Sequence, residues 1–124
     1  PLSPQAMAVL VRVNGLGDAL VFPSPNSGKT PAVQSDASIR ALLNRMKHTG
    51  FTVHGFRSAF RDWASESAHA DREVAEAALS HAVGTDTERA YARSDLFERR
   101  RTLMDNWGLF CAGRTSKEVL FGSR

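Results

Sequence analysis

Four side chains suited to phosphate chemistry occur in order along the chain. His54 and Arg57 belong to the sequence HGFR, His81 begins the sequence HAVG, and Tyr91 lies within ERAYARSD. They supply two imidazoles, a guanidinium and a phenol, a set that could bind a phosphodiester and attack it without a metal or cofactor. Tyr91 is the one tyrosine in the sequence, so a phenolic nucleophile has a single candidate.

His54 and Arg57 are three residues apart at the start of a predicted helix, which places them on adjacent parts of one face. The first turn of a helix favours an anion through its free amides and partial positive charge, and arginine adds a planar fork that matches two phosphate oxygens. HxxR is nevertheless a short pattern. A surface ion pair for Arg57 and a backbone-bonded His54 remain the common alternative.

His81 follows a predicted helix end, and Tyr91 comes ten residues later. An imidazole in such a turn can donate a hydrogen bond to a phosphate oxygen or to a leaving group near neutral pH. The phenol would need nearby positive charge to attack as a phenolate. The alternatives are a histidine that bonds the last helix carbonyls and a half-buried structural tyrosine.

Apolar periodicity and cap residues predict a mainly α protein, a compact helical bundle-like fold with at most a short strand near residues 19–22. Predicted helices cover residues 4–13, a segment between the cap Ser35 and the stop Gly50, residues 55–66, 72–79 and 95–110, and a short helix that starts at Thr85 and carries Tyr91. Residues 23–31 have the composition of an exposed loop.

Cap and core residues are predicted for several of these helices. Ser3, Asp71 and Ser94 are placed to cap the helices that follow them. The inward face of the third helix is predicted to hold Phe56, Phe60, Trp63 and Ala64, and the last helix carries a stripe of Leu96, Leu103, Trp107 and Phe110. That stripe could pack on its own core or on a neighbouring protomer.

Composition sets the outer bounds. A chain of 124 residues with 42% hydrophobic residues suits one domain, residues 1–124. It carries no signal sequence and no apolar run long enough to span a membrane, so we expect a cytoplasmic protein. One cysteine, Cys111, excludes an internal disulfide and a cysteine-based zinc site. The formal charge of +3 suits an anionic partner without identifying it.

The joint pattern resembles the catalytic domain of the tyrosine recombinases, the phage integrase family. HxxR, then L-S-H-A-V-G, then a tyrosine within about one helix of that glycine follow the family's order, and the stretches TVHGFRSAFRDWASE and AYARSDLFERRRTLMDNW resemble prophage and genomic-island integrases. The resemblance implies that His54, Arg57 and His81 contact the scissile phosphate. It implies that Tyr91 is the nucleophile and forms a 3′-phosphotyrosyl link.

The resemblance also implies partners: double-stranded DNA attachment sites in a bacterial nucleoid, and four protomers assembled on two sites, with the helix at 95–110 as a candidate contact between protomers. The family's first catalytic arginine and hairpin lysine have no match here. Arg12 and Lys29 occur in other contexts, a helix end and a proline-bounded loop. We therefore expect the chain alone to be nearly inert.

Two other functions fit parts of the pattern. A remnant that retains only DNA binding or oligomerisation would not need the missing charges. A type IB topoisomerase uses similar phosphotyrosyl chemistry, although the short distance from Gly84 to Tyr91 favours a recombinase.

Overall fold

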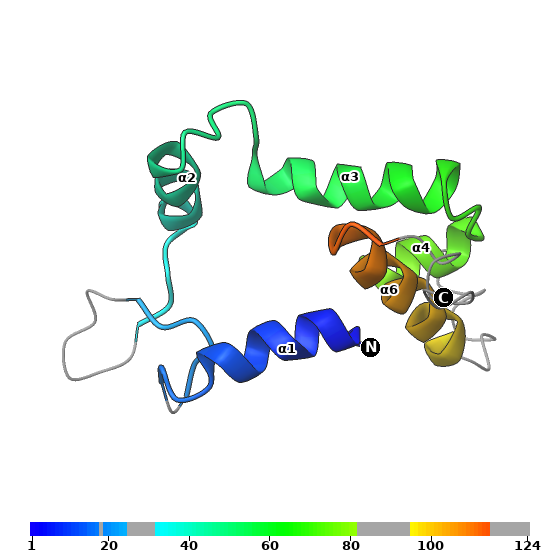
Figure 1. Cartoon of the computed structure of the whole chain (residues 1–124), viewed down its shortest axis with the longest axis horizontal. Coiled ribbons are helices and arrows are strands. Elements are labelled where there is room, and N and C mark those ends of the chain that lie inside the picture. Colours follow the sequence, from blue (N-terminus) through cyan, green and yellow to red (C-terminus); the bar gives the residue numbers. More distant parts are fainter. Residues whose placement is uncertain (18, 25–31, 82–94, 115–124) are drawn as a thin grey trace, which may run out of the picture. The chain divides into compact units, whose positions relative to one another are not determined.

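A computed structural model describes residues 1–17, 19–24, 32–81 and 95–114. Its helices are α1 (Pro4–Val13), α2 (Asp36–Arg45), α3 (Val53–Glu66), α4 (Arg72–Ala78) and α6 (Phe97–Cys111) (Figure 1). The predicted mainly α fold is confirmed. Residues 19–22 do not form a strand, and next to them Pro23 pairs with Val33 in an isolated antiparallel bridge.

The chain divides into two compact units. One consists of residues 1–7 and 57–124, and the other of residues 8–56. The described helices α4 and α6 belong to the first unit, together with α3 from Arg57 onward, and α2 belongs to the second. The prediction of a single domain over residues 1–124 stays a prediction.

The ends of α1 coincide with the predicted ones. The Ser3 hydroxyl accepts a hydrogen bond from the amide of Ala6 at 3.2 Å, and Pro4 is the first helical residue. Gly15 follows the helix with φ of +87°, a left-handed conformation that glycine adopts without strain. A capping serine and a terminating Asn-Gly pair therefore set both boundaries.

Helix α2 begins after Ser35, as predicted, but it ends before the predicted stop. The Ser35 hydroxyl pairs with the hydroxyl of Ser38 at 3.1 Å rather than with a backbone amide. The helix ends at Arg45, and Lys47 has φ of +61°, so the chain has already left the helix before Gly50. A left-handed lysine carries no composition signal that sequence patterns detect.

Helix α3 begins two residues earlier than the predicted Gly55. The amide of Gly55 donates to the Thr52 hydroxyl at 3.0 Å, which satisfies a free amide of the first turn. Phe60 and Ala64 are buried as predicted, whereas Phe56 is 54% exposed, so its assignment to the inward face was wrong. In the described core, α3 contributes residues only from Phe60 onward. The spacing of apolar residues shows which side of a helix faces the core, but not how far along the helix the packing extends.

The core of the first unit joins α3, α4 and α6. Its buried members are Phe60, Ala64, Val74, Ala75 and Leu103. Trp63 and Trp107 pack against this cluster with ring centroids 5.0 Å apart, and Phe60 meets Trp107 edge-on at 5.4 Å. Full burial of a Phe or Leu side chain, as at Phe60 and Leu103, contributes about 1.5–3 kcal/mol. The apolar stripe of α6 therefore packs on its own chain through Leu103 and Trp107.

Helix α6 begins later than the predicted residue 95. Leu96 has φ of +57° and lies outside the helix, and the Phe97 amide donates to Asp95 Oδ1 at 2.9 Å. An aspartate that bonds an amide two residues on favours a turn over a helix at this point. The predicted cap Ser94 lies outside the described residues.

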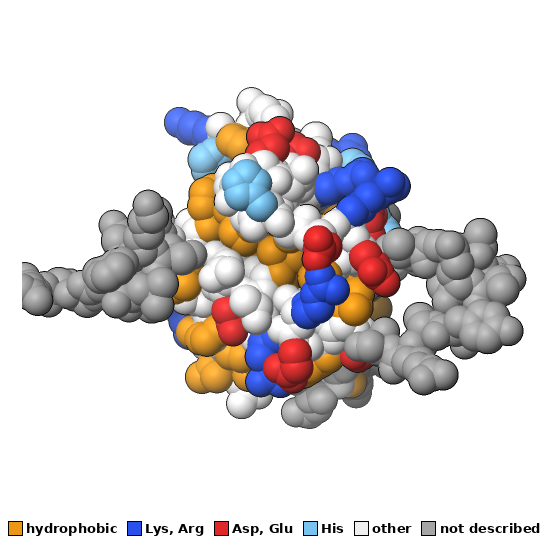
Figure 2. All heavy atoms as spheres, turned by 90° about the vertical axis from the view of Figure 1, so that its right-hand side faces the viewer, with side chains coloured by type: hydrophobic (Ala, Val, Ile, Leu, Met, Phe, Trp, Pro, Cys, Tyr) orange, Lys and Arg blue, Asp and Glu red, His pale blue; other side chains and the backbone are white. Residues whose placement is uncertain are grey.

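Acidic side chains neutralise the run of arginines at 99–101. Arg99 pairs with Asp71, the residue that precedes α4. Arg100 pairs with Asp95, and Arg101 pairs with Glu98. Figure 2 shows the same mixture, with Lys and Arg side chains interspersed among Asp and Glu side chains over one face. In the part of the chain that the structure describes, no helix has the length and apolar character to cross a membrane.

Candidate active site

Arg57 and His81 meet between α3 and the turn that follows α4. Nη2 of Arg57 donates to the carbonyl oxygen of Leu79 at 2.6 Å and lies 2.7 Å from Nε2 of His81. The HxxR helix and the L-S-H segment are therefore joined through the two residues that the sequence singled out. Both side chains are solvent-exposed, which leaves them accessible to an anion.

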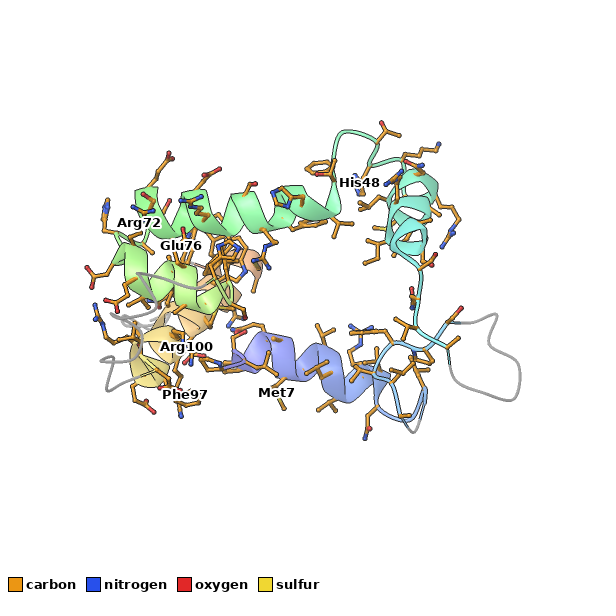
Figure 3. The ribbon with its side chains drawn as sticks, turned by 180° about the vertical axis from the view of Figure 1, so that it is seen from behind. Met7, His48, Arg72, Glu76, Phe97 and Arg100 are labelled. Atoms are coloured by element: carbon orange, nitrogen blue, oxygen red, sulfur yellow. The ribbon has the colours of Figure 1, made fainter. Side chains whose placement is uncertain are left out.

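Glu76 connects His81 to a second arginine. Its Oε2 lies 2.6 Å from Nδ1 of His81, and its Oε1 lies 3.0 Å from Nη2 of Arg61 on α3. Figure 3 shows Glu76 on the side of α4 that faces α3. We refer to Arg57, Arg61, Glu76 and His81 as the polar cluster. All four belong to the first compact unit.

Glu76 is not among the site residues predicted from the sequence. It is only 9% exposed and shares its helix with the buried Val74 and Ala75. A carboxylate on the apolar side of a short helix could have been noticed as a signal, because a buried charge requires partners. The partners themselves, Arg61 and His81, come from other segments, and their proximity could not be deduced from spacing.

The protons of the polar cluster can be placed from its donors and acceptors. A guanidinium only donates, so Nε2 of His81 accepts from Arg57 and carries no proton. The proton of the neutral imidazole is then on Nδ1, which donates to Glu76. This hydrogen bond from His81 is the main cause that lowers the pKa of Glu76 below its ordinary value. The charges of Arg61 and Arg72 act in the same direction, as does that of His81 when it is protonated, and burial opposes them.

The backbone fixes the turn that carries His81. The amide of His81 donates to the carbonyl of Glu76 at 2.9 Å, and Ser80 has φ of +59°. Helix α4 ends at Ala78, one residue before its predicted end, with Leu79 as the C-terminal cap. Because Leu79 also accepts the Arg57 hydrogen bond, the turn is tied to α3 by backbone as well as by side chains.

His54 is the second residue of α3 and is exposed. It lines a cavity of about 480 Å³ in the second compact unit, together with residues of α2 and of the segment before α3. His54 and Arg57 are three positions apart in the same helix, α3. Its predicted contact with a phosphate stays a prediction.

The remaining predicted site residue, Tyr91, lies outside the described residues, as do Gly84 and the helix predicted to start at Thr85. Of the four predicted residues, the structure thus brings Arg57 and His81 together. Over the described ranges, no group of three or more His, Cys, Asp or Glu side chains is arranged to hold a metal ion. Chemically, the polar cluster offers a guanidinium and an imidazole to one anion, with a carboxylate behind the imidazole.

Comparison with known proteins relates the chain to the integrases of the tyrosine recombinase family, which confirms the family predicted from the motifs. Over 108 residues, or 86% of its length, the chain is 34% identical to the prophage integrase IntA of Escherichia coli strain K12. It spans about a quarter (26%) of that protein's length. No protein-family model matches the chain. No solved structure matches it significantly.

Proposed function

We propose that the chain is the C-terminal part of the catalytic domain of a tyrosine recombinase that integrates or excises a mobile DNA element. The hydrogen bond between Arg57 and His81 carries this proposal, because it joins two motifs of the integrase pattern that are 24 residues apart. The relationship to a prophage integrase supports it separately. The substrate is a pair of double-stranded DNA attachment sites in a bacterial nucleoid.

In the proposed reaction, the Tyr91 oxygen attacks the scissile phosphorus and releases its proton to solvent. The bond from phosphorus to the 5′ oxygen breaks, and that oxygen takes up a proton from Nε2 of protonated His81. Arg57 and His54 bind the non-bridging oxygens, where negative charge increases in the transition state. The 3′-phosphotyrosyl ester keeps the energy of the broken bond. A 5′-hydroxyl from the other site can therefore reverse the step without ATP or a metal.

The 124-residue chain by itself is proposed to have little activity. The resembling family completes its pocket with a further arginine and a lysine. Arg12 lies in the last turn of α1, and Lys29 lies outside the described residues, so neither is assigned such a role. The loss of one preorganised charge contact lowers the rate by on the order of a hundredfold.

Assembly of four protomers on two sites is part of the same proposal. Because Leu103 and Trp107 of α6 already pack on their own core, a neighbouring protomer would contact the outer side of this helix. Phe97, which is 39% exposed, is available there, whereas Phe110 lies against Trp63 and Trp107 on the core side.

The test uses the full-length recombinase and a nicked attachment-site DNA, with denaturation to trap a covalent adduct. We expect the wild type to form the adduct, Tyr91→Phe to form none, and Arg57→Gln to be slowed by on the order of a hundredfold. Arg101→Gln is the matched control. Arg101 is exposed and already paired with Glu98, so the rate should be close to that of the wild type.

Two results would contradict the proposal in different ways. Equal adduct from Tyr91→Phe would remove Tyr91 as the nucleophile. A wild type that binds attachment DNA but gives no adduct would favour the non-catalytic remnant over the recombinase.

A further inference from the structure

Glu76 is held by two partners that approach it from different segments. Each carboxylate oxygen has its own partner: Oε1 forms an ion pair with Arg61 at 3.0 Å, and Oε2 forms a hydrogen bond with His81 at 2.6 Å. A carboxylate this far from solvent is stable only when it is paired and hydrogen-bonded. Its position on the inner side of α4 therefore depends on both partners being present.

The hydrogen bonds of the polar cluster have one consistent direction. Arg57 donates to Nε2 of His81, and Nδ1–H of His81 donates to Glu76. Arg61 forms an ion pair with the other carboxylate oxygen. If the imidazole carried its proton on Nε2 instead, a donor would face Arg57 and a lone pair would face the carboxylate. Glu76 therefore selects the tautomer in which Nε2 is directed at Arg57.

Glu76 also fixes the place of the imidazole. Its carbonyl accepts from the His81 amide at 2.9 Å while its side chain accepts from the ring, so backbone and side chain of one residue hold both ends of His81. Such a two-point attachment leaves the ring little freedom to rotate. A histidine held with one nitrogen on a carboxylate presents its other nitrogen in a defined direction.

We propose that Glu76 is the positioning residue of the recombinase site, which directs Nε2 of His81 at the scissile phosphate and stabilises the imidazolium when His81 carries a second proton. This inference rests on the proposed function. Glu76 contacts neither DNA nor the reacting atoms and acts through His81. Arg61 in turn keeps the carboxylate in place from α3.

The first test needs no DNA and no catalysis. Nitrogen-15 NMR of the ring nitrogens in the wild-type 124-residue chain identifies the tautomer of His81, with His81→Gln used to assign its signals among the four histidines. We expect the proton on Nδ1. A proton on Nε2 in the wild type would overturn the inference. This result would not depend on the rates of the variants or on whether the full-length protein recombines DNA.

The second test measures the rate of adduct formation by the full-length recombinase at saturating DNA. Glu76→Gln keeps the shape but removes the charge. We expect its rate to fall at least about tenfold, because neutralising a carboxylate that orients a catalytic histidine causes losses of this size or larger. DNA affinity should change little. The alkaline limit of the rate–pH profile should move to lower pH, since the imidazolium loses the carboxylate that stabilises it.

Control variants separate positioning from folding. Glu73→Gln alters an exposed carboxylate on the same helix and should match the wild type. Glu76→Asp retains the charge and should recover part of the rate and the wild-type pH profile. If Glu76→Gln folds and has the wild-type rate and pH profile while the wild type forms the adduct, the positioning role is wrong although the recombinase assignment stands. A wild type without an adduct contradicts the proposed function instead.

Discussion

Arg57 and His81 share a hydrogen bond in which Nη2 of the arginine donates to Nε2 of the imidazole across 2.7 Å. Two side chains that we propose to bind one phosphate thus form a hydrogen bond with each other while no phosphate is present. The bond requires an unprotonated Nε2, whereas a histidine that donates to a phosphate oxygen must carry a proton there. Binding of DNA therefore has to exchange one arrangement for the other.

This exchange predicts proton uptake when the full-length recombinase binds attachment-site DNA. Arg57 from α3 and Glu76 from α4 contact the imidazole, and Arg61 and Arg72 act on Glu76. A bound phosphate adds negative charge, which favours a protonated ring. At a pH where free His81 is neutral, we expect up to about one proton per occupied site. The number of protons taken up is measured by calorimetric titration in two buffers that differ in their protonation enthalpy.

The matched variant for this prediction is His81→Gln, which can still bond Arg57 but cannot take up a proton near neutral pH. The buffer dependence should disappear in this variant. If the wild type shows no buffer dependence, the imidazole does not gain a proton on binding, and its role as the acid for the leaving 5′ oxygen is wrong.

The lowered pKa of Glu76 predicts a specific loss of stability in acid. Because this pKa is lower in the folded than in the unfolded chain, the folded chain binds fewer protons in this range. The contribution of Glu76 is complete above the ordinary glutamate pKa of about 4.3 and is lost as the pH falls through its lowered folded value. Urea unfolding of the 124-residue chain at a series of pH values measures this dependence.

Glu76→Gln should flatten that acid limb of the stability profile and lower the free energy of unfolding at neutral pH by about 1.5–3 kcal/mol, the range for hydrogen bonds to charged groups. Glu73→Gln, on the exposed side of the same helix, should leave both unchanged within error. An unaltered acid limb in Glu76→Gln would mean that the His81 hydrogen bond does not hold the carboxylate ionised in solution.

Gly108 predicts a packing effect at the start of α1. A Cβ at this position would lie 2.5 Å from both Ser3 Oγ and Gln5 Oε1 and 2.8 Å from Ser3 Cβ. Alanine ordinarily stabilises a helix by about 1 kcal/mol relative to glycine, whereas overpacking lowers the unfolding free energy by about 1–3 kcal/mol. Because Ser3 is only 3% exposed, it has little room to move. We expect Gly108→Ala to lower the unfolding free energy rather than raise it.

A double-mutant cycle identifies the cause. Ser3→Gly removes Ser3 Oγ and Cβ, two of the three atoms that would collide, and retains an acceptable helix cap, while Gln5 Oε1 ends a flexible side chain that can turn away. The double variant with Gly108→Ala should therefore be more stable than the sum of the two single effects predicts. Additive effects would show that α1 and α6 do not approach closely at this point.

The sequence predicted what depends on local signals. Serine, proline and an Asn-Gly pair set both ends of α1, and the periodicity of Leu103 and Trp107 identified the side of α6 that packs on the core. The exposure of Phe56 could not be predicted in this way, because helical phase says which side a residue is on and not whether a partner lies there. The left-handed conformations of Lys47 and Leu96, which shortened two predicted helices, have no composition signal either.

For the site, the sequence identified the groups but not the network. Arg57 and His81 were selected from their order in the chain, and the structure brings them together. Glu76 was missed because its importance comes from contacts with Arg61 and His81, which only the packing of α4 against α3 creates. The catalytic roles of all four residues, His54, Arg57, His81 and Tyr91, stay predictions.

Trp63 and Trp107 are the two tryptophans of the sequence, and their rings lie 5.0 Å apart between α3 and α6. Nearly all the indole fluorescence of the protein therefore originates from one place. Rings this close also couple electronically, so near-ultraviolet circular dichroism should carry a signal from the pair. The 124-residue chain thus contains its own optical probe, with no added dye, for whether α6 stays on its core during the proposed assembly of protomers.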